Sequence, residues 1–175
     1  MRNLAAFLSS VVIVGAATGG SAAVKPLDPA SLAGVYKQRF TNGLVTGETF
    51  TSEDILEIVP VSNTSAYVRV HLEFYNGHTC SLSGIAHVER QALVYRTDLD
   101  YEQPPLNRCV LSIERSGDQI MLSDGRNSCK GFCGVRGSLM NVDFPAASRR
   151  PIRYMARLKA SPGYRDAVAL DANRR

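Results

Sequence analysis

The sequence predicts a mainly β protein: a small antiparallel up-and-down barrel of about eight strands, with a short C-terminal helical segment. Three observations lead to this prediction. In residues 66–74 the apolar side chains occupy every second position, which is typical of a strand with one buried face. Asn76-Gly77 follows directly and is a strong hairpin signal, because a type I′ turn needs positive φ at both central positions. Short apolar runs then recur between tight turns, which favours a closed barrel over a β-sandwich.

The remaining strands follow from the same alternation, taken in chain order. Pro60 ends one strand, since proline lacks the N–H group that a sheet ladder requires. The run 92–96 is short and is expected at an edge of the sheet. Residues 97–108 include Pro104-Pro105 and several acids, which predicts an exposed loop. The expected strands are 34–40, 55–59, 66–74, 80–88, 92–96, 109–113, 120–122 and 135–142, with 48–51 as a short addition, and the expected core is Val68, Val70, Leu72, Phe74, Leu82, Leu111, Ile113, Ile120 and Leu122.

The basic C-terminal segment, residues 149–175, differs in charge from the rest of the chain. It has eight Arg or Lys residues against two Asp, a net charge of +6, whereas residues 24–148 have 11 basic and 14 acidic residues. Apolar residues at 152, 155 and 158 have helical spacing, although a strand also fits residues 152–158; residue propensities favour the helix. Ser161-Pro162 resembles a helix N-cap and first turn, which predicts a second short helix ending near Asp171.

The first 23 residues have the three parts of a secretory signal peptide. Arg2 supplies the positive start, residues 4–17 are largely apolar, and Ser21 and Ala23 suit the −3 and −1 positions of a cleavage site. The apolar run is shorter than the roughly 20 residues that span a bilayer, which argues against a membrane anchor. No cysteine lies near the cleavage site, so a lipid anchor there is not expected. The protein is therefore expected to be periplasmic or secreted.

Residues 24–148 are expected to form one disulfide-stapled β domain. They hold all four cysteines, and an even number in an exported chain indicates disulfides. A zinc site is the alternative, but such sites have two close cysteine pairs and only Cys129 and Cys133 are close in sequence. Cys80 and Cys109 lie on the apolar faces of strands expected to be neighbours. We therefore predict the pairs Cys80–Cys109 and Cys129–Cys133.

The sequence shows no motif for catalysis or metal binding. His71, His78 and His87 have no cysteine or carboxylate at the spacing of a metal site. A Gly-x-Ser-x-Gly nucleophile motif is absent, and four paired cysteines would leave no thiol nucleophile. Nucleic acid is a poor partner for an exported chain without interleaved basic and aromatic residues. We expect no enzymatic activity, no metal and no cofactor.

Residues 128–138 contain the strongest candidate binding site. Three glycines, the small disulfide ring expected between Cys129 and Cys133, and two basic residues predict a tight loop whose backbone N–H groups could bind an anion. Lys130 and Arg136 would add charge to it. The alternative is that the glycines only permit positive φ beside a disulfide, and that Arg136 pairs with a nearby acid. The candidate binding residues of this loop are Lys130, Gly134, Arg136 and Gly137.

The order of these motifs resembles a four-cysteine exported domain of bacterial proteins of the lysozyme-inhibitor type. The matching motifs are the hairpin, Cys80-Ser81-Leu82-Ser83-Gly84, Cys109-Val110-Leu111, Asp124 and Cys129-x3-Cys133-Gly134-x-Arg136-Gly137. The resemblance covers roughly residues 35–144 and implies a periplasmic β barrel. The small inhibitors of c-type lysozymes enter the enzyme's cleft with a Ser-Gly-x-x-Tyr loop. This chain has His87 where that pattern has tyrosine, and Ser83 and His87 join the candidate binding residues.

Together these features predict an exported, non-enzymatic β-barrel binding protein of the bacterial periplasm. The resemblance implies a lysozyme or another envelope protein as its partner. The alternative is an envelope-associated structural protein whose basic tail binds an anionic surface, since each basic residue near such a surface contributes about 1 kcal/mol. A hydrolase ranks third. The tail residues expected to make the surface contact are Arg149, Arg150, Arg153, Arg157 and Lys159.

We predict that the exported protein begins near Val24, because the small residues before it suit signal peptidase. The intact mass of the protein from a periplasmic extract should correspond to residues 24–175. A mass that includes residues 1–23 would contradict the signal-peptide interpretation.

Overall fold

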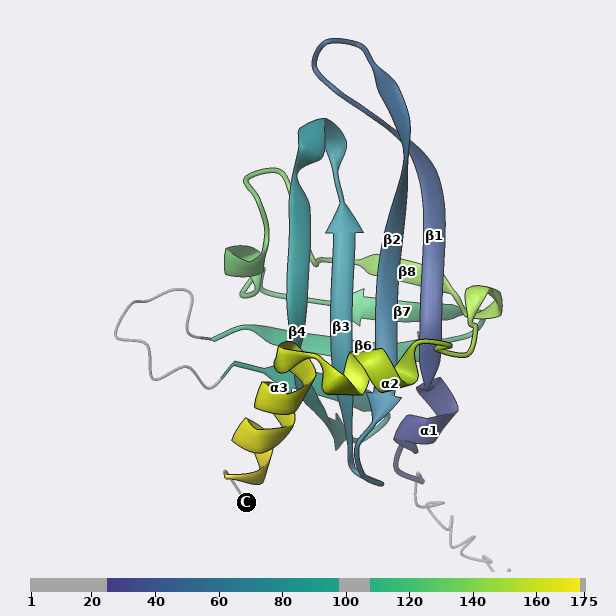
Figure 1. Cartoon of the computed structure of the whole chain (residues 1–175), viewed down its shortest axis with the longest axis vertical. Helices are drawn as coiled ribbons and strands as arrows, with labels where there is room; N and C mark the ends of the chain where they lie inside the picture. The colour runs from purple at the N-terminus through teal and green to yellow at the C-terminus, as the bar shows by residue number, and fades with distance from the viewer. Residues whose placement is uncertain (1–24, 98–107, 174–175) are drawn as a thin grey trace, which may run out of the picture.

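Eight antiparallel strands form a single sheet in which each strand pairs with its neighbours in the chain (Figure 1). The computed structural model describes residues 25–97 and 108–173; the expected signal peptide and nearly all of the expected acidic loop lie outside these residues. The sheet forms a nearly closed barrel, which confirms the predicted fold class. The strands are β1 (Gly34–Gly43), β2 (Thr49–Pro60), β3 (Ser65–Glu73), β4 (Thr79–Glu89), β5 (Ala92–Arg96), β6 (Val110–Ser116), β7 (Gln119–Ser123) and β8 (Val142–Pro145).

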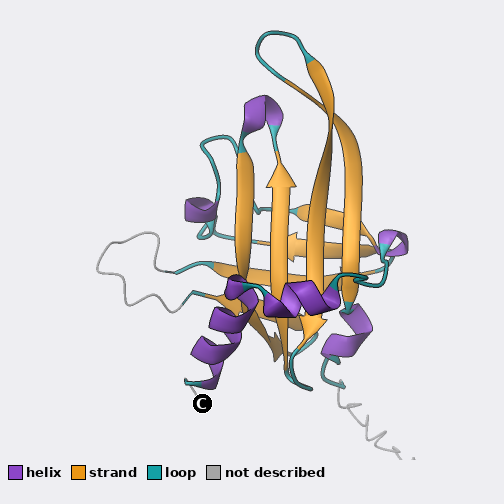
Figure 2. Ribbon diagram, viewed as in Figure 1, coloured by secondary structure: helices purple, strands orange, loops and turns teal. Residues whose placement is uncertain are grey.

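The hydrophobic core lies inside the barrel, between the long strands β1–β4 and the later strands that cross behind them (Figure 2). The alternation that predicted β3 also places its even-numbered side chains inside. Asn76 and Gly77, with φ of 61° and 70°, make the predicted turn into β4. Of the predicted core residues, Val68, Val70, Leu72, Leu82, Leu111, Ile113, Ile120 and Leu122 are buried, and Phe74 packs against them partly buried.

The barrel is closed by the segment that follows β8 rather than by β8 itself. β1 and β8 are the two edges of the sheet. Val35 on β1 exchanges two backbone hydrogen bonds with Arg150, at 2.9 and 2.8 Å. The N–H of Lys37 donates to the hydroxyl of Ser148 at 3.3 Å. Residues 148–150 therefore satisfy the edge of β1 that a longer β8 would have paired.

Three local predictions differ from the structure. The expected strands 48–51 and 55–59 are one strand, β2. β5 is not at an edge, because it pairs with β4 on one side and β6 on the other. Most of the expected strand 135–142 is a loop, and β8 begins only at Val142. The N–H groups of Gly137 and Met140 donate within the loop, to the carbonyl of Gly134 and the hydroxyl of Ser138, rather than to a strand. Length and alternation do not show which segment lies beside a strand, and this explains all three errors.

The C-terminal segment folds into two helices that cover the outer face of β2–β4 (Figure 1). They are α2 (Met155–Ala160) and α3 (Pro162–Ala172), and Ser161 caps α3 as predicted. The helical interpretation of residues 155–160 is thus confirmed. Leu158 and Tyr164 pack over Tyr67, whose ring lies 5.0 Å from that of Tyr164. β3 was expected to have one buried face, but Tyr67 is buried on the other, because the helices exclude water there. A third helix, α1 (Pro29–Leu32), lies at the start of the described chain.

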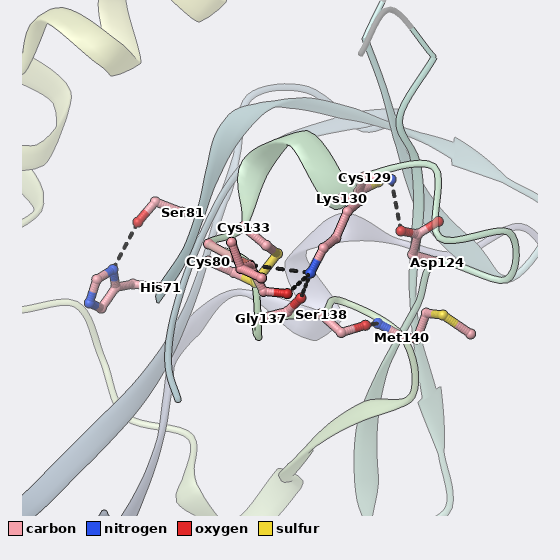
Figure 3. Close-up of a disulfide and its surroundings, with 12 residues drawn as sticks. His71, Cys80, Ser81, Asp124, Cys129, Lys130, Cys133, Gly137, Ser138 and Met140 are labelled. Atoms are coloured by element: carbon pink, nitrogen blue, oxygen red, sulfur yellow. Dashed lines mark hydrogen bonds between the residues drawn. A yellow bond between two sulfur atoms is a disulfide. The ribbon is translucent and has the colours of Figure 1, made fainter. Parts of the chain in front are cut away.

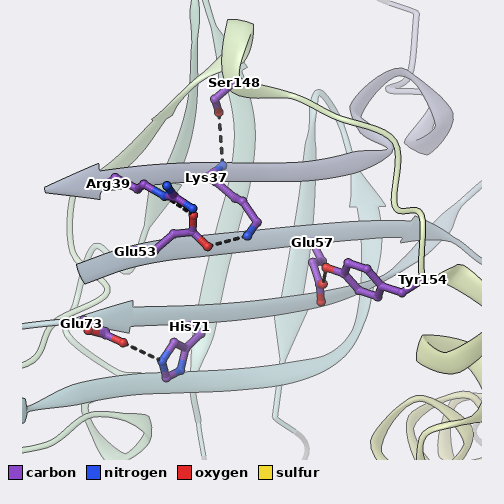
Figure 4. A network of polar contacts seen from close by, with 8 residues as sticks. All are labelled: Lys37, Arg39, Glu53, Glu57, His71, Glu73, Ser148 and Tyr154. Atoms are coloured by element: carbon purple, nitrogen blue, oxygen red, sulfur yellow. Dashed lines mark hydrogen bonds and ion pairs between the residues drawn. The ribbon is translucent and has the colours of Figure 1, made fainter. Parts of the chain in front are cut away.

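A buried carboxylate holds the C-terminal segment against the sheet. Glu57 on β2 has no exposed surface, and one of its oxygens accepts a hydrogen bond from Arg69 on β3. The other accepts from the Tyr154 hydroxyl (Figure 4). Burial, and then the neighbouring Glu57 carboxylate, raise the pKa of Tyr154 to about 12. The Glu57–Tyr154 contact therefore links the first half of the barrel to the segment that follows β8.

The Tyr154 contact predicts a loss of stability at alkaline pH. The pKa of Tyr154 is higher in the folded protein than its ordinary value of 10.0. The stability that this contact contributes is therefore complete below pH 10 and is lost as the pH rises toward 12. The free energy of unfolding should fall between about pH 9 and pH 11.5 in the unmodified protein. In Tyr154→Phe this fall should be smaller by about 1–2 kcal/mol, a value that allows for solvent screening.

Urea unfolding at the two pH values measures this difference. Tyr75→Phe, which removes an exposed tyrosine hydroxyl at the far end of β3, is the control and should keep the alkaline loss of the unmodified protein. Equal losses in the unmodified protein and in Tyr154→Phe would show that Tyr154 does not carry the effect.

Candidate functional site

The two disulfides join Cys80 to Cys133 and Cys109 to Cys129, so the predicted pairing is wrong. The prediction assumed that Cys80 and Cys109 lie on neighbouring strands. β5 separates β4 from β6 in the sheet, and the end of β4 that carries Cys80 lies beside the loop after β7 instead. The N–H of Gly134 donates to the carbonyl of Thr79 at 2.7 Å and aligns Cys133 with Cys80. In the described part of the chain no cysteine is free.

A buried aspartate positions the second disulfide. Asp124 follows β7 and has no exposed surface. One of its carboxylate oxygens accepts hydrogen bonds from the N–H and hydroxyl of Ser128, at 2.7 and 2.9 Å, and the other accepts from the N–H of Cys129 at 2.8 Å. Such a carboxylate fixes the turn that presents Cys129 to Cys109. The loop that carries the candidate site is thus held to the barrel at two points.

Lys130 is bound by the loop itself (Figure 3). Its ammonium group donates to three backbone carbonyls: to Gly134 at 3.2 Å, to Val135 at 2.8 Å and to Gly137 at 2.6 Å. These bonds use all three of its donors. Lys130 was expected to bind an anion, but all three of its N–H donors bind backbone carbonyls of residues 134–137.

The loop glycines are explained by close packing rather than by unusual backbone angles. Neither Gly134 nor Gly137 has a positive φ. A Cβ atom at Gly137 would lie 2.8 Å from the Cys80 sulfur, and one at Gly134 would lie 3.0 Å from His78. Their N–H groups donate within the protein, that of Gly134 to Thr79 and that of Gly137 to Gly134. The predicted anion-binding nest would need free N–H groups at these positions, and they are occupied.

The 3₁₀ turn η1 (Tyr75–Gly77) contacts both the β1–β2 hairpin and the loop after the 3₁₀ turn η2 (Lys130–Phe132). The hairpin tip and η1 lie at the same end of the barrel (Figure 1). The Tyr75 hydroxyl donates to the carbonyl of Leu44 in the hairpin at 2.9 Å. The guanidinium carbon of Arg136 lies 6.0 Å from the centre of the Tyr75 ring. Val45 and Val135 are 66 and 83% exposed. We call Val45, Tyr75, Val135 and Arg136 the loop-end surface.

The structure leaves Arg136 available to a partner. The expected alternative was an ion pair with a nearby acid, and in the described ranges no acidic group lies within 4 Å of its guanidinium. Its only close contact there is the Tyr75 ring. Sequence analysis missed Tyr75 and Val45. Tyr75 stands directly before the Asn76-Gly77 turn, and an aromatic residue at a hairpin turn is the signal that could have identified it.

Ser83 and His87 lie apart from the loop-end surface. They belong to β4 and therefore do not form a loop, and His87 lies toward the opposite end of that strand. Nε2 of His87 is 2.8 Å from a carboxylate oxygen of Asp171 on α3. Both residues line a groove between β4, β5 and α3. The structure thus divides the predicted binding residues between two places.

His71 and Glu73 lie side by side on β3 (Figure 4) and are part of a chain of polar contacts that also includes Ser52 and Ser81. Ser52 donates to Glu73 at 2.6 Å, Glu73 lies 3.7 Å from Nε2 of His71, and Nδ1 of His71 lies 2.9 Å from the Ser81 hydroxyl. Burial raises the pKa of the neighbouring Asp54. Serine, histidine and glutamate also occur together in hydrolases, and here the His71 side chain is 41% exposed. Among the described residues no group is positioned to hold a metal ion.

Three of the six described basic residues of the C-terminal segment contact the protein through their side chains. Arg149 donates to the carbonyl of Ser31 at 2.9 Å, and Arg150 donates to that of Ala147 at 2.9 Å. The guanidinium of Arg157 lies 5.5 Å from the centre of the Tyr154 ring. Arg153 and Lys159 are exposed. The segment is therefore part of the folded surface, and the side chains of Arg149, Arg150 and Arg157 are held against it.

Neither a protein-family model, nor a curated protein, nor a solved structure matches this chain. Two disulfides indicate an oxidising environment outside the cytoplasm. None of the described helices is long and apolar enough to cross a membrane. We therefore infer the function from the chemistry of the loop-end surface and from the charges around it.

The three hydrogen bonds of Lys130 predict that this residue stabilises the loop. Lys130→Met keeps a long side chain but removes the donors, and the carbonyls of residues 134–137 lose their partner. We expect a loss of about 1–3 kcal/mol in the free energy of unfolding and faster amide exchange in residues 134–138. Lys159→Met, at an exposed position of α2, is the control and should change neither quantity. Unchanged exchange in Lys130→Met would mean that the disulfides alone hold the loop.

Proposed function

We propose that the protein is an exported binding protein that recognises a protein partner through its loop-end surface. Arginine and tyrosine are the residue types that most often dominate the binding energy of protein interfaces, and the two valines add apolar area beside them. Val135 is the observation that carries this proposal. It is 83% exposed on a loop that two disulfides and Lys130 hold in place, so the exposed apolar side chain does not result from a loose segment.

Rigidity of the loop supports a binding role. Ordering a flexible loop at an interface costs about 0.5–1.5 kcal/mol for each immobilised side chain, and a loop that is already ordered avoids much of this cost. Asp124, the Cys80–Cys133 disulfide and Lys130 each fix a different part of residues 124–137. Arg136 is therefore presented at one position, stacked on Tyr75, before any partner arrives.

The chemistry of Arg136 favours a partner with an accessible carboxylate. Its guanidinium is planar and fork-shaped, which suits a carboxylate accepting two parallel hydrogen bonds. Lysozymes have a cleft with two catalytic carboxylates, which makes them a suitable partner class. The resemblance to lysozyme inhibitors points in the same direction. Since Ser83 and His87 lie within β4, we propose that Arg136 and its neighbours, and not a Ser-Gly loop, make the contact.

The alternative partner is an anionic envelope surface that the C-terminal segment would contact. Arg153 and Lys159 are exposed and are the residues best placed for it. Deleting residues 149–175 would not test this alternative, because it would also uncover Val59 and Tyr67. Charge-neutralising substitutions on the intact protein separate the two partners instead.

We predict that Arg136→Ala weakens binding to a c-type lysozyme by about 10- to 100-fold, as expected for a central arginine at an interface. The unfolding free energy should change by no more than about 0.5 kcal/mol, because the side chain is exposed. Calorimetric titration of lysozyme and thermal unfolding measure the two quantities. Arg165→Ala, on the exposed surface of α3, is the matched control and should bind as the unmodified protein does.

A second arm tests the alternative partner with vesicles that contain anionic lipid. The double variant Arg153→Gln/Lys159→Gln is tested for vesicle binding, and Arg136→Ala is tested for binding to partners captured from an envelope extract. The loop-end proposal is wrong if the double variant no longer binds vesicles while Arg136→Ala still binds every captured partner. Binding that survives moderate salt and requires Arg136 supports it, because a diffuse charge contact would be screened.

A further inference from the structure

An open pocket of about 330 Å³ lies at the seam of the barrel, between α1, the β6–β7 turn and the segment after β8. Two arginines, Arg115 and Arg149, reach it from different elements. We propose that this pocket binds a small amphipathic carboxylate, with the carboxylate between the two guanidinium groups and the apolar part inside. The pocket shares no residue with the loop-end surface, so the inference is independent of the proposed function.

The pocket results from the way the barrel closes. β8 ends at Pro145, and the chain turns away from the sheet in the 3₁₀ turn η3 (Ala146–Ser148) before Arg150 pairs with Val35. The space beside β1 that a longer β8 would fill stays open there. Its lining includes side chains of β1, β6, β7 and η3. Pockets at the mouths of β barrels are frequent ligand sites.

Each of the two arginines is oriented by one hydrogen bond to the backbone. Nε of Arg115 donates to the carbonyl of Gly117 at 3.1 Å, and Nη1 of Arg149 donates to the carbonyl of Ser31 at 2.9 Å. A guanidinium has five N–H donors, so each keeps several for a ligand. Within the part of the chain that the structure describes, neither arginine forms an ion pair. Both arginines line the same pocket as Tyr36.

The other walls of the pocket explain why the ligand should be amphipathic and carry a single charge. Leu32, Tyr36, Ile120 and Ala146 are apolar, and the Tyr36 hydroxyl is already bonded to the carbonyl of Leu32 at 2.9 Å. Asp118 at the rim is the only acid among the lining residues. Two arginines and one aspartate give the site a net charge of +1, which balances a carboxylate better than a doubly charged phosphate. The apolar walls then bury a short hydrocarbon chain.

Titration of the purified protein with hexanoate tests the proposal. We expect saturable binding, with acetate and 1-hexanol each at least about tenfold weaker, because acetate lacks the apolar chain and hexanol lacks the charge. Arg115→Gln and Arg149→Gln should each weaken hexanoate binding by about tenfold, the loss of one charge-assisted hydrogen bond. Arg126→Gln, which removes an arginine at the opposite end of β7, is the matched control and should have no effect.

Nuclear magnetic resonance locates the bound ligand and keeps the test decisive if Arg149→Gln destabilises the protein. Hexanoate should shift the methyl signals of Ile120 and Ala146, and Arg115→Gln alone should reduce these shifts at equal hexanoate concentration. Binding that does not saturate, shifts confined to other residues, or unchanged affinity in Arg115→Gln would each overturn the proposal.

Discussion

The closure of the barrel depends on a pair of backbone hydrogen bonds between Val35 and Arg150. β1 has ten residues and β8 only four, so the edge of β1 needs another partner for its N–H and C=O groups. Residues 148–150 supply it. Once the chain crosses the seam at this point, the residues that follow lie outside the sheet. The positions of α2 and α3, and the open pocket beside η3, both result from this crossing.

The same crossing determines which polar groups the sheet can bury. Glu57 would be solvated on an uncovered sheet, and the arriving C-terminal segment removes it from water. A buried carboxylate without partners is costly, and Arg69 and Tyr154 provide them. Tyr154 belongs to the segment that buries Glu57. This segment therefore covers the outer face of the sheet and also supplies a hydrogen-bond donor to the Glu57 carboxylate. The basic C-terminal segment is therefore a part of the β domain's structure as well as a source of positive charge.

The candidate site was only partly predictable from sequence. The three glycines and the two basic residues correctly marked residues 128–138 as a loop, although the Cys129–Cys133 ring expected there does not form. The roles within it depended on which groups meet in space: Lys130 binds three carbonyls, Gly137 gives room to the Cys80 sulfur, and Arg136 stacks on Tyr75. None of these contacts follows a periodic pattern. Tyr75 and Val45 enter the site only because two hairpins meet there.

The sequence by itself determined the mainly β fold, the inward face of β3, β4, β6 and β7, the turn at Asn76-Gly77 and the helix that begins after Ser161. These features depend on side chains within a few residues of one another, through alternation, preferred backbone angles and capping. Only the tertiary structure decided the cysteine pairs, the interior position of β5, the burial of Tyr67 and Glu57, and the loop at residues 135–141. Each of these depends on which distant segment lies alongside, and local patterns do not carry that information.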